Sequence, residues 1–110
     1  MNNHKNIASS KVFEAIELVN YTEDGIVSRI ICENGVNSVT IMAFDEKQAL
    51  SEHTVPFNAL VYVVDGTGEF TIGYDKYILK AGQIILMPAN MPHSVNALSQ
   101  FKMILTMLRS

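Results

Sequence analysis

The sequence has few of the features that mark disulfide-bonded, membrane-spanning or nucleic-acid-binding proteins. It contains one cysteine, Cys32, which cannot form a disulfide within the chain and therefore fits a cytoplasmic location. No run approaches the roughly 18 apolar residues that a membrane-spanning helix needs, and the N-terminus has no apolar stretch typical of a signal peptide. The formal charge is -3, with acidic and basic residues intermixed, so we expect no basic surface for nucleic acid.

What the sequence does contain is enough apolar material for one packed domain. The chain has 110 residues, and 48% of them are hydrophobic, so we expect a single domain spanning residues 1–110. Residues 1–8, which include His4, are polar, and we expect them to be flexible. Cys32 follows an apolar run and is predicted to be buried and unreactive.

Most of the chain alternates apolar and polar residues with a period of two, which predicts β-strands. The Asn34-Gly35 pair lies between two such runs and predicts a hairpin. We expect residues 12–17 to form a short helical turn. Residues 101–108 could also form a helix, but their alternation favours a strand. The predicted strands cover residues 18–21, 26–32, 36–44, 50–54, 59–64, 69–72, 76–79, 84–87, 93–95 and 101–108. Many short strands separated by glycine and proline predict an all-β sandwich or barrel.

Two histidines stand out because each lies next to a strand-like apolar run. His53 falls within residues 51–66 and His93 within residues 82–97. A small β-fold that brings them together would place two imidazoles at one site, where they could act as acid, base or hydrogen-bond partner near neutral pH. A histidine in a β-core is also often structural, and no third group is evident to orient either ring.

These two stretches resemble the paired motifs of the cupin superfamily. The first family motif is a histidine, one residue, a second histidine, three or four residues, a glutamate, six residues and a glycine. Its frame fits with His53 first and Gly66 last, while Val55 stands at the second histidine and Ala59 at the glutamate.

The second family motif is a glycine, five residues, a proline, one residue, a glycine, two residues, a histidine, three residues and an asparagine. Gly82, Pro88 and His93 fit this pattern at the right spacings. Asn90 replaces the internal glycine, and Ala97 replaces the asparagine.

The resemblance implies an all-β, double-stranded β-helix (jelly-roll) barrel over about residues 25–108. Cupins bind iron, manganese, nickel or zinc through three histidines and a glutamate, and only His53 and His93 carry over. Two imidazoles hold a metal weakly, so we expect little bound metal. Glu52 and Asn58 are each one residue from an inward-facing position and should point to the opposite face, unless a bulge re-aims one of them.

The resemblance and the alternation together outline a candidate ligand pocket. Apolar residues that share the parity of His53 are expected to line the barrel interior, although methionines at such positions are more often core filler. The predicted pocket consists of His53, Val55, Ala59, Val61, His93, Phe101 and Met103. Such a cavity suits a small apolar or aromatic molecule with one polar group.

We therefore expect a single-domain cupin that binds a small molecule, with a sensing or regulatory role. One alternative is a metal-dependent enzyme of the dioxygenase or isomerase type, whose missing ligands are replaced from elsewhere. A second alternative is a structural or interaction protein. Val55 and Ala59 cannot bind a metal, and this favours the binding protein over the metalloenzyme.

The opposite parity of the same strand is apolar as well. Leu60, Tyr62 and Val64 alternate with the interior positions, and a strand that is apolar on both faces is not expected to face water. A second sheet or a second subunit should cover it. The resemblance implies a homodimer, with residues 13–21 as a candidate for the segment that lies on the partner.

Overall fold

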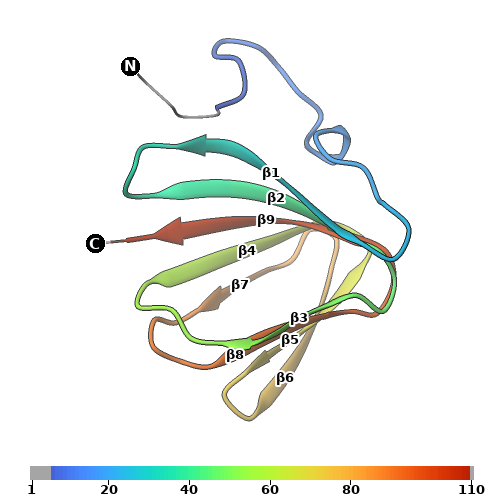
Figure 1. Cartoon of the computed structure of the whole chain (residues 1–110), viewed down its shortest axis with the longest axis vertical. Coiled ribbons are helices and arrows are strands. Elements are labelled where there is room, and N and C mark those ends of the chain that lie inside the picture. The colour runs from blue at the N-terminus through green and yellow to red at the C-terminus, as the bar shows by residue number, and fades with distance from the viewer. Residues whose placement is uncertain (1–5, 110) are drawn as a thin grey trace.

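The computed structural model describes residues 6–109 and consists of two antiparallel sheets with one 3-10 turn. This confirms the predicted all-β barrel with a short helical turn before it (Figure 1). Between residues 6 and 109 there is no helix long and apolar enough to cross a membrane. The elements are η1 (Ala15–Glu17), β1 (Ile26–Glu33), β2 (Ser38–Phe44), β3 (Ala49–His53), β4 (Asn58–Asp65), β5 (Thr67–Ile72), β6 (Asp75–Lys80), β7 (Ile84–Met87), β8 (His93–Ala97) and β9 (Phe101–Leu108).

The strand order interleaves distant parts of the chain. The five-stranded sheet has the order β1-β2-β9-β4-β7, and the four-stranded sheet has the order β3-β8-β5-β6. β7 and β8 belong to different sheets and are joined by a short connection, and the same holds for β3 and β4. The ends of these strands therefore meet at one end of the barrel, which we call the histidine end because His53 and His93 lie there.

Strand positions follow the predicted alternation closely. β7 and β9 have the predicted bounds, and the other barrel strands differ from theirs by one or two residues. The Asn34-Gly35 hairpin is also confirmed, with a loop between Glu33 and Ser38 that is longer than the simplest two-residue turn. The Asn34 side-chain oxygen accepts hydrogen bonds from the main-chain N–H groups of Val36 and Asn37 at 3.0 and 2.7 Å, and these bonds fix the wider turn.

The strand predicted at residues 18–21 is wrong. Leu18 and Val19 are buried, but they lie outside any strand and pack on the outer face of the five-stranded sheet against Ile41 and Ala43. The apolar pattern there reflects burial against a sheet rather than strand pairing.

The N-terminal segment lies along the outside of β1 and β2 (Figure 1). Phe13 and Tyr21 pack against the cluster formed by Leu18 and Val19. Residues 13–21, predicted to lie on a partner, thus cover part of their own sheet. The prediction of flexibility for residues 1–8, His4 included, falls mainly on residues 1–5, which lie outside the described residues. Ile7 donates a main-chain hydrogen bond to the Ile31 carbonyl at 2.8 Å.

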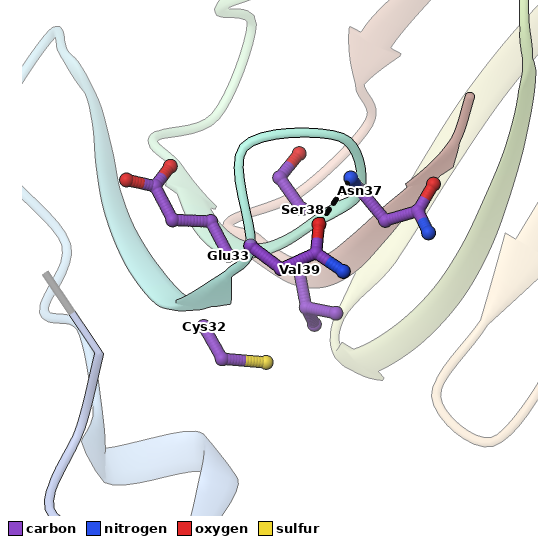
Figure 2. A pocket seen from close by; sticks show the side chains of 6 residues that line it. Cys32, Glu33, Asn37, Ser38 and Val39 are labelled. Atoms are coloured by element: carbon purple, nitrogen blue, oxygen red, sulfur yellow. Dashed lines mark hydrogen bonds between the residues drawn. The ribbon is translucent and has the colours of Figure 1, made fainter. Parts of the chain in front are cut away.

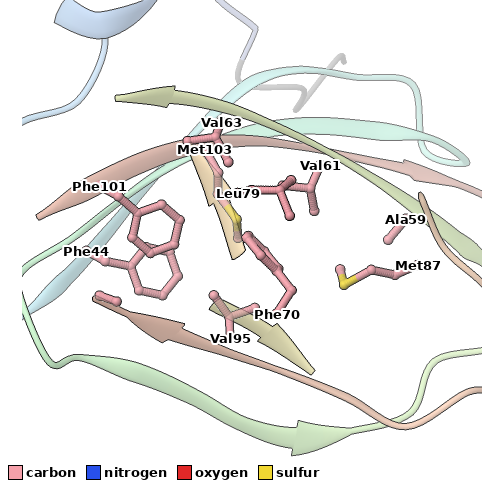
Figure 3. Close-up of a cluster of buried hydrophobic side chains, with 11 residues drawn as sticks. Phe44, Ala59, Val61, Val63, Phe70, Leu79, Met87, Val95, Phe101 and Met103 are labelled. Carbon is pink, nitrogen blue, oxygen red and sulfur yellow. The ribbon is translucent and has the colours of Figure 1, made fainter. Parts of the chain in front are cut away.

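The barrel interior is filled by a cluster of buried side chains from both sheets (Figure 3). Phe44 and Phe101 stack with ring centroids 4.5 Å apart, and the Phe70 ring meets the Phe101 ring edge-on at 6.1 Å. Phe101 and Phe44 lie at the opposite end of the cluster from Ala59 and Met87 (Figure 3). The remaining members of the cluster are Val61, Val63, Leu79, Val95, Ala97 and Met103.

Candidate functional site

The neighbouring antiparallel strands β3 and β8 bring together His53 and His93, which belong to separate sequence motifs. The two residues are direct partners in the antiparallel ladder, and their ring centroids lie 4.4 Å apart with an interplanar angle of 65°. A register shift between Leu50 and His53 adds one residue to β3. Because of this bulge, Leu50 and His53 both face partners that point inward, namely Val95 and His93.

Hydrogen bonds orient both imidazole rings in the same way. The Nδ1 atom of His53 lies 2.9 Å from the Ser51 carbonyl oxygen, and the Nδ1 atom of His93 lies 3.2 Å from the Met91 carbonyl oxygen. A carbonyl oxygen only accepts, so each Nδ1 carries the proton and donates it. In the neutral ring each Nε2 atom is then a hydrogen-bond acceptor.

Neither Nε2 atom has a partner among residues 6–109. His93 is only 4% exposed, yet in the described part of the chain the one buried side-chain polar atom without a partner is Ser38 Oγ. The Nε2 atom of His93 therefore keeps some contact with solvent. His53 is exposed, so the His93 ring lies in the wall of the barrel and the His53 ring lies at its rim.

Burial sets the charge state of His93. Removal from water lowers the pKa of the His93 ring, and the nearby His53 ring lowers it further, while the hydrogen bond to Met91 acts in the opposite direction. The net effect is a pKa below the ordinary value, so the ring is neutral at pH 7. A neutral His93 presents an acceptor at Nε2 rather than a positive charge.

The other predicted pocket residues divide between the histidine end and the core. Ala59 is buried in β4, where it lies between Met87 and Met107 on the neighbouring strands. Val55 is half-buried in the β3–β4 connection, and its carbonyl accepts a hydrogen bond from the Asn90 N–H at 2.8 Å. Val61, Phe101 and Met103 are members of the buried cluster. The histidine pair is thus the main set of side chains available to a ligand at the histidine end.

The residues at this end do not fit the metal that the family resemblance implies. Between residues 6 and 109, no group of three or more histidine, cysteine, aspartate or glutamate side chains is placed to hold an ion. The bulge near Glu52 does not bring that carboxylate to the pair, and Asn58 Oδ1 accepts the Ala89 N–H at 2.8 Å. Two imidazoles are the whole donor set, which falls short of the three protein ligands of a typical catalytic zinc site.

A hollow of about 430 Å³ lies beside the strand ends that carry the histidine pair, and neither histidine is part of its lining. Its wall contains Glu52, which precedes His53, and Pro92, which precedes His93. Sequence reasoning missed this hollow because it forms where the β5–β6 turn meets the β7–β8 connection, two segments that no motif joins. The Gly73 N–H donates to the Pro92 carbonyl at 2.8 Å and ties these segments together. The complete lining is Glu52, Ile72, Gly73, Tyr74, Asp75, Met91 and Pro92.

A second hollow, of about 230 Å³, lies at the turn end of the β1–β2 hairpin (Figure 2). It is lined by Cys32, Glu33, Asn34, Asn37, Ser38 and Val39. The prediction that Cys32 is buried is wrong, because the thiol is exposed. A register shift between Ile30 and Cys32 pairs Cys32 with Val39, which is on the outer face. The lining offers no histidine or cation to activate the thiol, so this hollow is the weaker candidate.

Comparison with known proteins agrees with the fold. Residues 40–108 match the cupin domain family. A conserved protein of unknown function from Streptococcus pyogenes is 30% identical, with a TM-score of 0.92, and the match covers 100% of this chain and 96% of that protein. A cupin 2 conserved barrel domain protein from Leptotrichia buccalis is 36% identical, with a TM-score of 0.84, over 88% of this chain and 47% of that protein.

A cupin superfamily protein from Desulfitobacterium hafniense is 18% identical and shares the fold with a TM-score of 0.90, over 99% of this chain and 100% of that protein. No curated protein matches the chain. The family match spans more than half of the sequence, and it includes both histidines. The chain therefore belongs to the cupin family and forms a small single-domain barrel within it.

Proposed function

We propose that this cupin binds a small molecule at the histidine end of the barrel and recognises it through His53 and His93. The observation that carries the proposal is the shared orientation of the two rings. Each Nδ1 atom donates to a main-chain carbonyl, which leaves both Nε2 atoms without a partner among residues 6–109. Two such acceptors side by side form a recognition site for a polar group.

The charge state of His93 indicates which polar group would bind. A neutral His93 ring offers an acceptor, so the ligand should bring a hydrogen-bond donor such as a hydroxyl group. A ligand carboxylate would be disfavoured here, because its oxygens would face the lone pair of an imidazole acceptor. The adjoining hollow contains Ile72, Met91 and Pro92, which suit an apolar or aromatic body. We infer a small aromatic or aliphatic molecule with one hydroxyl-type donor.

The proposed role is recognition rather than turnover, in keeping with a sensing or regulatory function. A general acid or base is usually oriented by a third side chain that also tunes it, whereas both rings here are held by main-chain carbonyls. We place the protein in the cytoplasm because Cys32 is a free, exposed thiol.

Two matched probes test this proposal. Phenol carries a donor and anisole is its methyl ether without one, and benzoate adds a negative charge to a similar ring. Titrations followed by the ¹⁵N signals of the histidine side chains should show phenol perturbing the Nε2 atoms of His53 and His93, with a Kd of about millimolar order for so small a ligand. Anisole and benzoate should bind at least about tenfold more weakly.

Variants then locate the binding. His53→Ala removes one acceptor from an exposed ring and should abolish the phenol response while leaving the fold intact. Leu98→Ala changes an exposed apolar side chain outside the lining of the hollow and serves as the control. Equal binding of phenol and anisole would overturn the assignment of the pair as an acceptor site, and phenol binding that survives His53→Ala would move the site elsewhere.

A metal-dependent enzyme is the second candidate, and one observation favours it. Histidines that ligate metals usually donate the other ring nitrogen to a carbonyl or carboxylate, and both rings here do so. The incomplete donor set argues against it. Elemental analysis of the purified protein decides between the two. One metal per chain that survives a chelator would favour the metal-dependent enzyme. Sub-stoichiometric metal would favour the small-molecule-binding protein.

A further inference from the structure

The four-stranded sheet carries a row of directly paired residues that begins at the histidine end. His53 on β3 lies opposite His93 on β8, and His93 lies opposite Ile72 on β5. Ile72 in turn lies opposite Asp75 across the β5–β6 turn. Directly opposite residues of an antiparallel pair have their side chains on the same face of the sheet. Because His93 is buried and Ile72 packs against the core cluster, the row belongs to the inner face.

Asp75 therefore has the inward parity of the edge strand β6. The alternation within β6 agrees, because Leu79, four positions further along, is 5% exposed and belongs to the core cluster. Lys76 falls on the opposite parity, so its side chain is directed to the other face. Asp75 itself is exposed, since β6 is the edge of the sheet. Its carboxylate thus lies on the face that carries the imidazole rings, at the margin of that face.

The hollow of about 430 Å³ contains Ile72 and Asp75 from this row. Glu52 also lines it, from the bulge in β3, and among the residues within 6–109 that form the lining none is basic. Tyr74 is fully exposed at the β5–β6 turn and Met91 is 40% exposed, so an aromatic ring and a thioether border the hollow. Carboxylates beside an aromatic ring favour a cation over an anion.

We propose, building on the function proposed above, that the ligand of the histidine end also carries an amine, whose ammonium group pairs with Asp75. The His93 ring supports a ligand here independently of the carboxylates. It is 4% exposed, and its Nε2 acceptor has no partner among residues 6–109. A buried polar group of this kind calls for a partner. The unpaired acceptor and the carboxylate of the same row match the two polar ends of one molecule.

The spacing of the strands sets the length of this molecule. Neighbouring strands lie about 4.8 Å apart, so the two steps from β8 to β6 separate the backbones of His93 and Asp75 by about 10 Å. Ile72 lies between them and offers an apolar surface to the middle of the ligand. The class that fits is a small hydroxyaryl or hydroxyalkyl amine, with its hydroxyl and ammonium groups at opposite ends of an apolar body.

Four probes test this class on the full chain. Tyramine has a hydroxyl and an ammonium group at opposite ends of one ring, phenol lacks the ammonium group, and phenethylamine lacks the hydroxyl group. In 3-(4-hydroxyphenyl)propionate a carboxylate replaces the ammonium group. In titrations followed by the ¹⁵N signals of the histidine side chains, tyramine should bind about three- to tenfold more tightly than phenol, as expected for an exposed charge-assisted pair. The propionate should bind more weakly than phenol, because its carboxylate would face Asp75.

Asp75→Asn keeps the shape of the side chain and removes its charge. Tyramine should lose its advantage over phenol in this variant, while phenol binds as it does to the wild type. Asp24→Asn is the matched control, because Asp24 is also exposed and lies in the turn before β1, outside the lining of the hollow. In the wild type, raising NaCl from about 20 to 300 mM should reduce the advantage of tyramine, because salt screens an exposed ion pair.

The outcomes for the amine and for the hydroxyl group are distinguishable. Equal binding of tyramine and phenol would overturn the amine and leave hydroxyl recognition in place. Equal binding of tyramine and phenethylamine would overturn hydroxyl recognition and, with it, the length assigned to the ligand. Tyramine that perturbs neither histidine would overturn both. An advantage of tyramine that survives Asp75→Asn, falls equally in Asp24→Asn or does not change with salt would overturn the pairing with Asp75.

Discussion

Gly66 and Gly82 end the first motif and begin the second, and both have a positive φ, but their surroundings differ. Gly66 has a φ of 75°, and a Cβ atom there would lie 1.9 Å from the Gln100 carbonyl oxygen. Gly82 has a φ of 92°, and a Cβ atom there would meet nothing within 4 Å. The first glycine is required by the backbone of a neighbouring segment as well as by its own conformation.

Alanine substitutions at the two glycines should therefore differ in cost. Gly66→Ala combines left-handed strain with a main-chain clash and is expected to lower the free energy of unfolding by about 3 kcal/mol or more. Gly82→Ala adds only the strain, about 1 kcal/mol. Chemical denaturation of the two variants measures both values. Equal losses would show that the β4–β5 connection can move away from Gln100 without cost.

Individual residues show where sequence reasoning succeeds and where it stops. Alternation places His93 on an inward-facing position, since side-chain direction follows from strand parity, whereas His53 is exposed and lies opposite His93 through a bulge in β3. The exposure of Cys32 could not be predicted in the same way, because one bulge in β1 changes the face on which the next residue lies. The hollow beside the pair depends on the meeting of two loops, for which a sequence period carries no information.

Among the elements, the N-terminal segment is held to the barrel by polar contacts as well as by apolar packing. The Tyr21 hydroxyl donates to an Asp65 carboxylate oxygen at 2.6 Å, and the Lys102 ammonium donates to the Ile16 carbonyl and lies over the Tyr21 ring at 4.8 Å. The Arg29 guanidinium donates to the Leu18 carbonyl at 3.1 Å. Residues 18–21 are predicted as a strand from their apolar character, while their real partners are side chains on the outer face of the sheet.

The Tyr21 contact should make stability depend on alkaline pH. Burial and the Asp65 carboxylate raise the pKa of Tyr21 above its ordinary value, so the folded state holds the phenol proton more tightly than the unfolded state does. This contribution is complete below about pH 10, the ordinary pKa of tyrosine, and is lost as the pH rises above it. Denaturation midpoints from pH 8 to about 11.5 should fall steeply in the wild type and less steeply in Tyr21→Phe.

The matched control for this prediction is Tyr74→Phe, because Tyr74 is fully exposed. Tyr21→Phe should also lose about 1 kcal/mol at neutral pH, where the hydrogen bond to Asp65 is intact in the wild type. An alkaline transition of the same steepness in Tyr21→Phe would assign the pH dependence to a different group.

In the molecule as a whole, the histidine end is the place where the two sheets could be joined by one ion. His53 and His93 belong to the four-stranded sheet, while Ala59 belongs to the five-stranded sheet. A metal held by all three positions would connect the sheets. The double variant Val55→His and Ala59→Glu restores the family donor set, and Zn²⁺ should then raise its thermal unfolding midpoint strongly, since ligand binding stabilises the folded state by about 4 kcal/mol at 1,000 times its Kd.

The wild-type chain should show little shift with Zn²⁺ in the same experiment, because two imidazoles bind weakly. Adding His53→Ala to the double variant provides the control and should remove most of the gain. A large shift in the wild type would mean that a third donor completes the site.

β9 is the last strand in the sequence, yet it lies at the centre of the five-stranded sheet, between β2 and β4. A ribosome therefore releases eight strands before the one that joins β2 to β4 leaves the exit tunnel. Until then the facing edges of β2 and β4 are unpaired, and Ile41 and Val61 lack their cross-strand partners on β9. Closure of the barrel must wait until β9 is synthesised, so until then these strand edges are open to pairing with other chains.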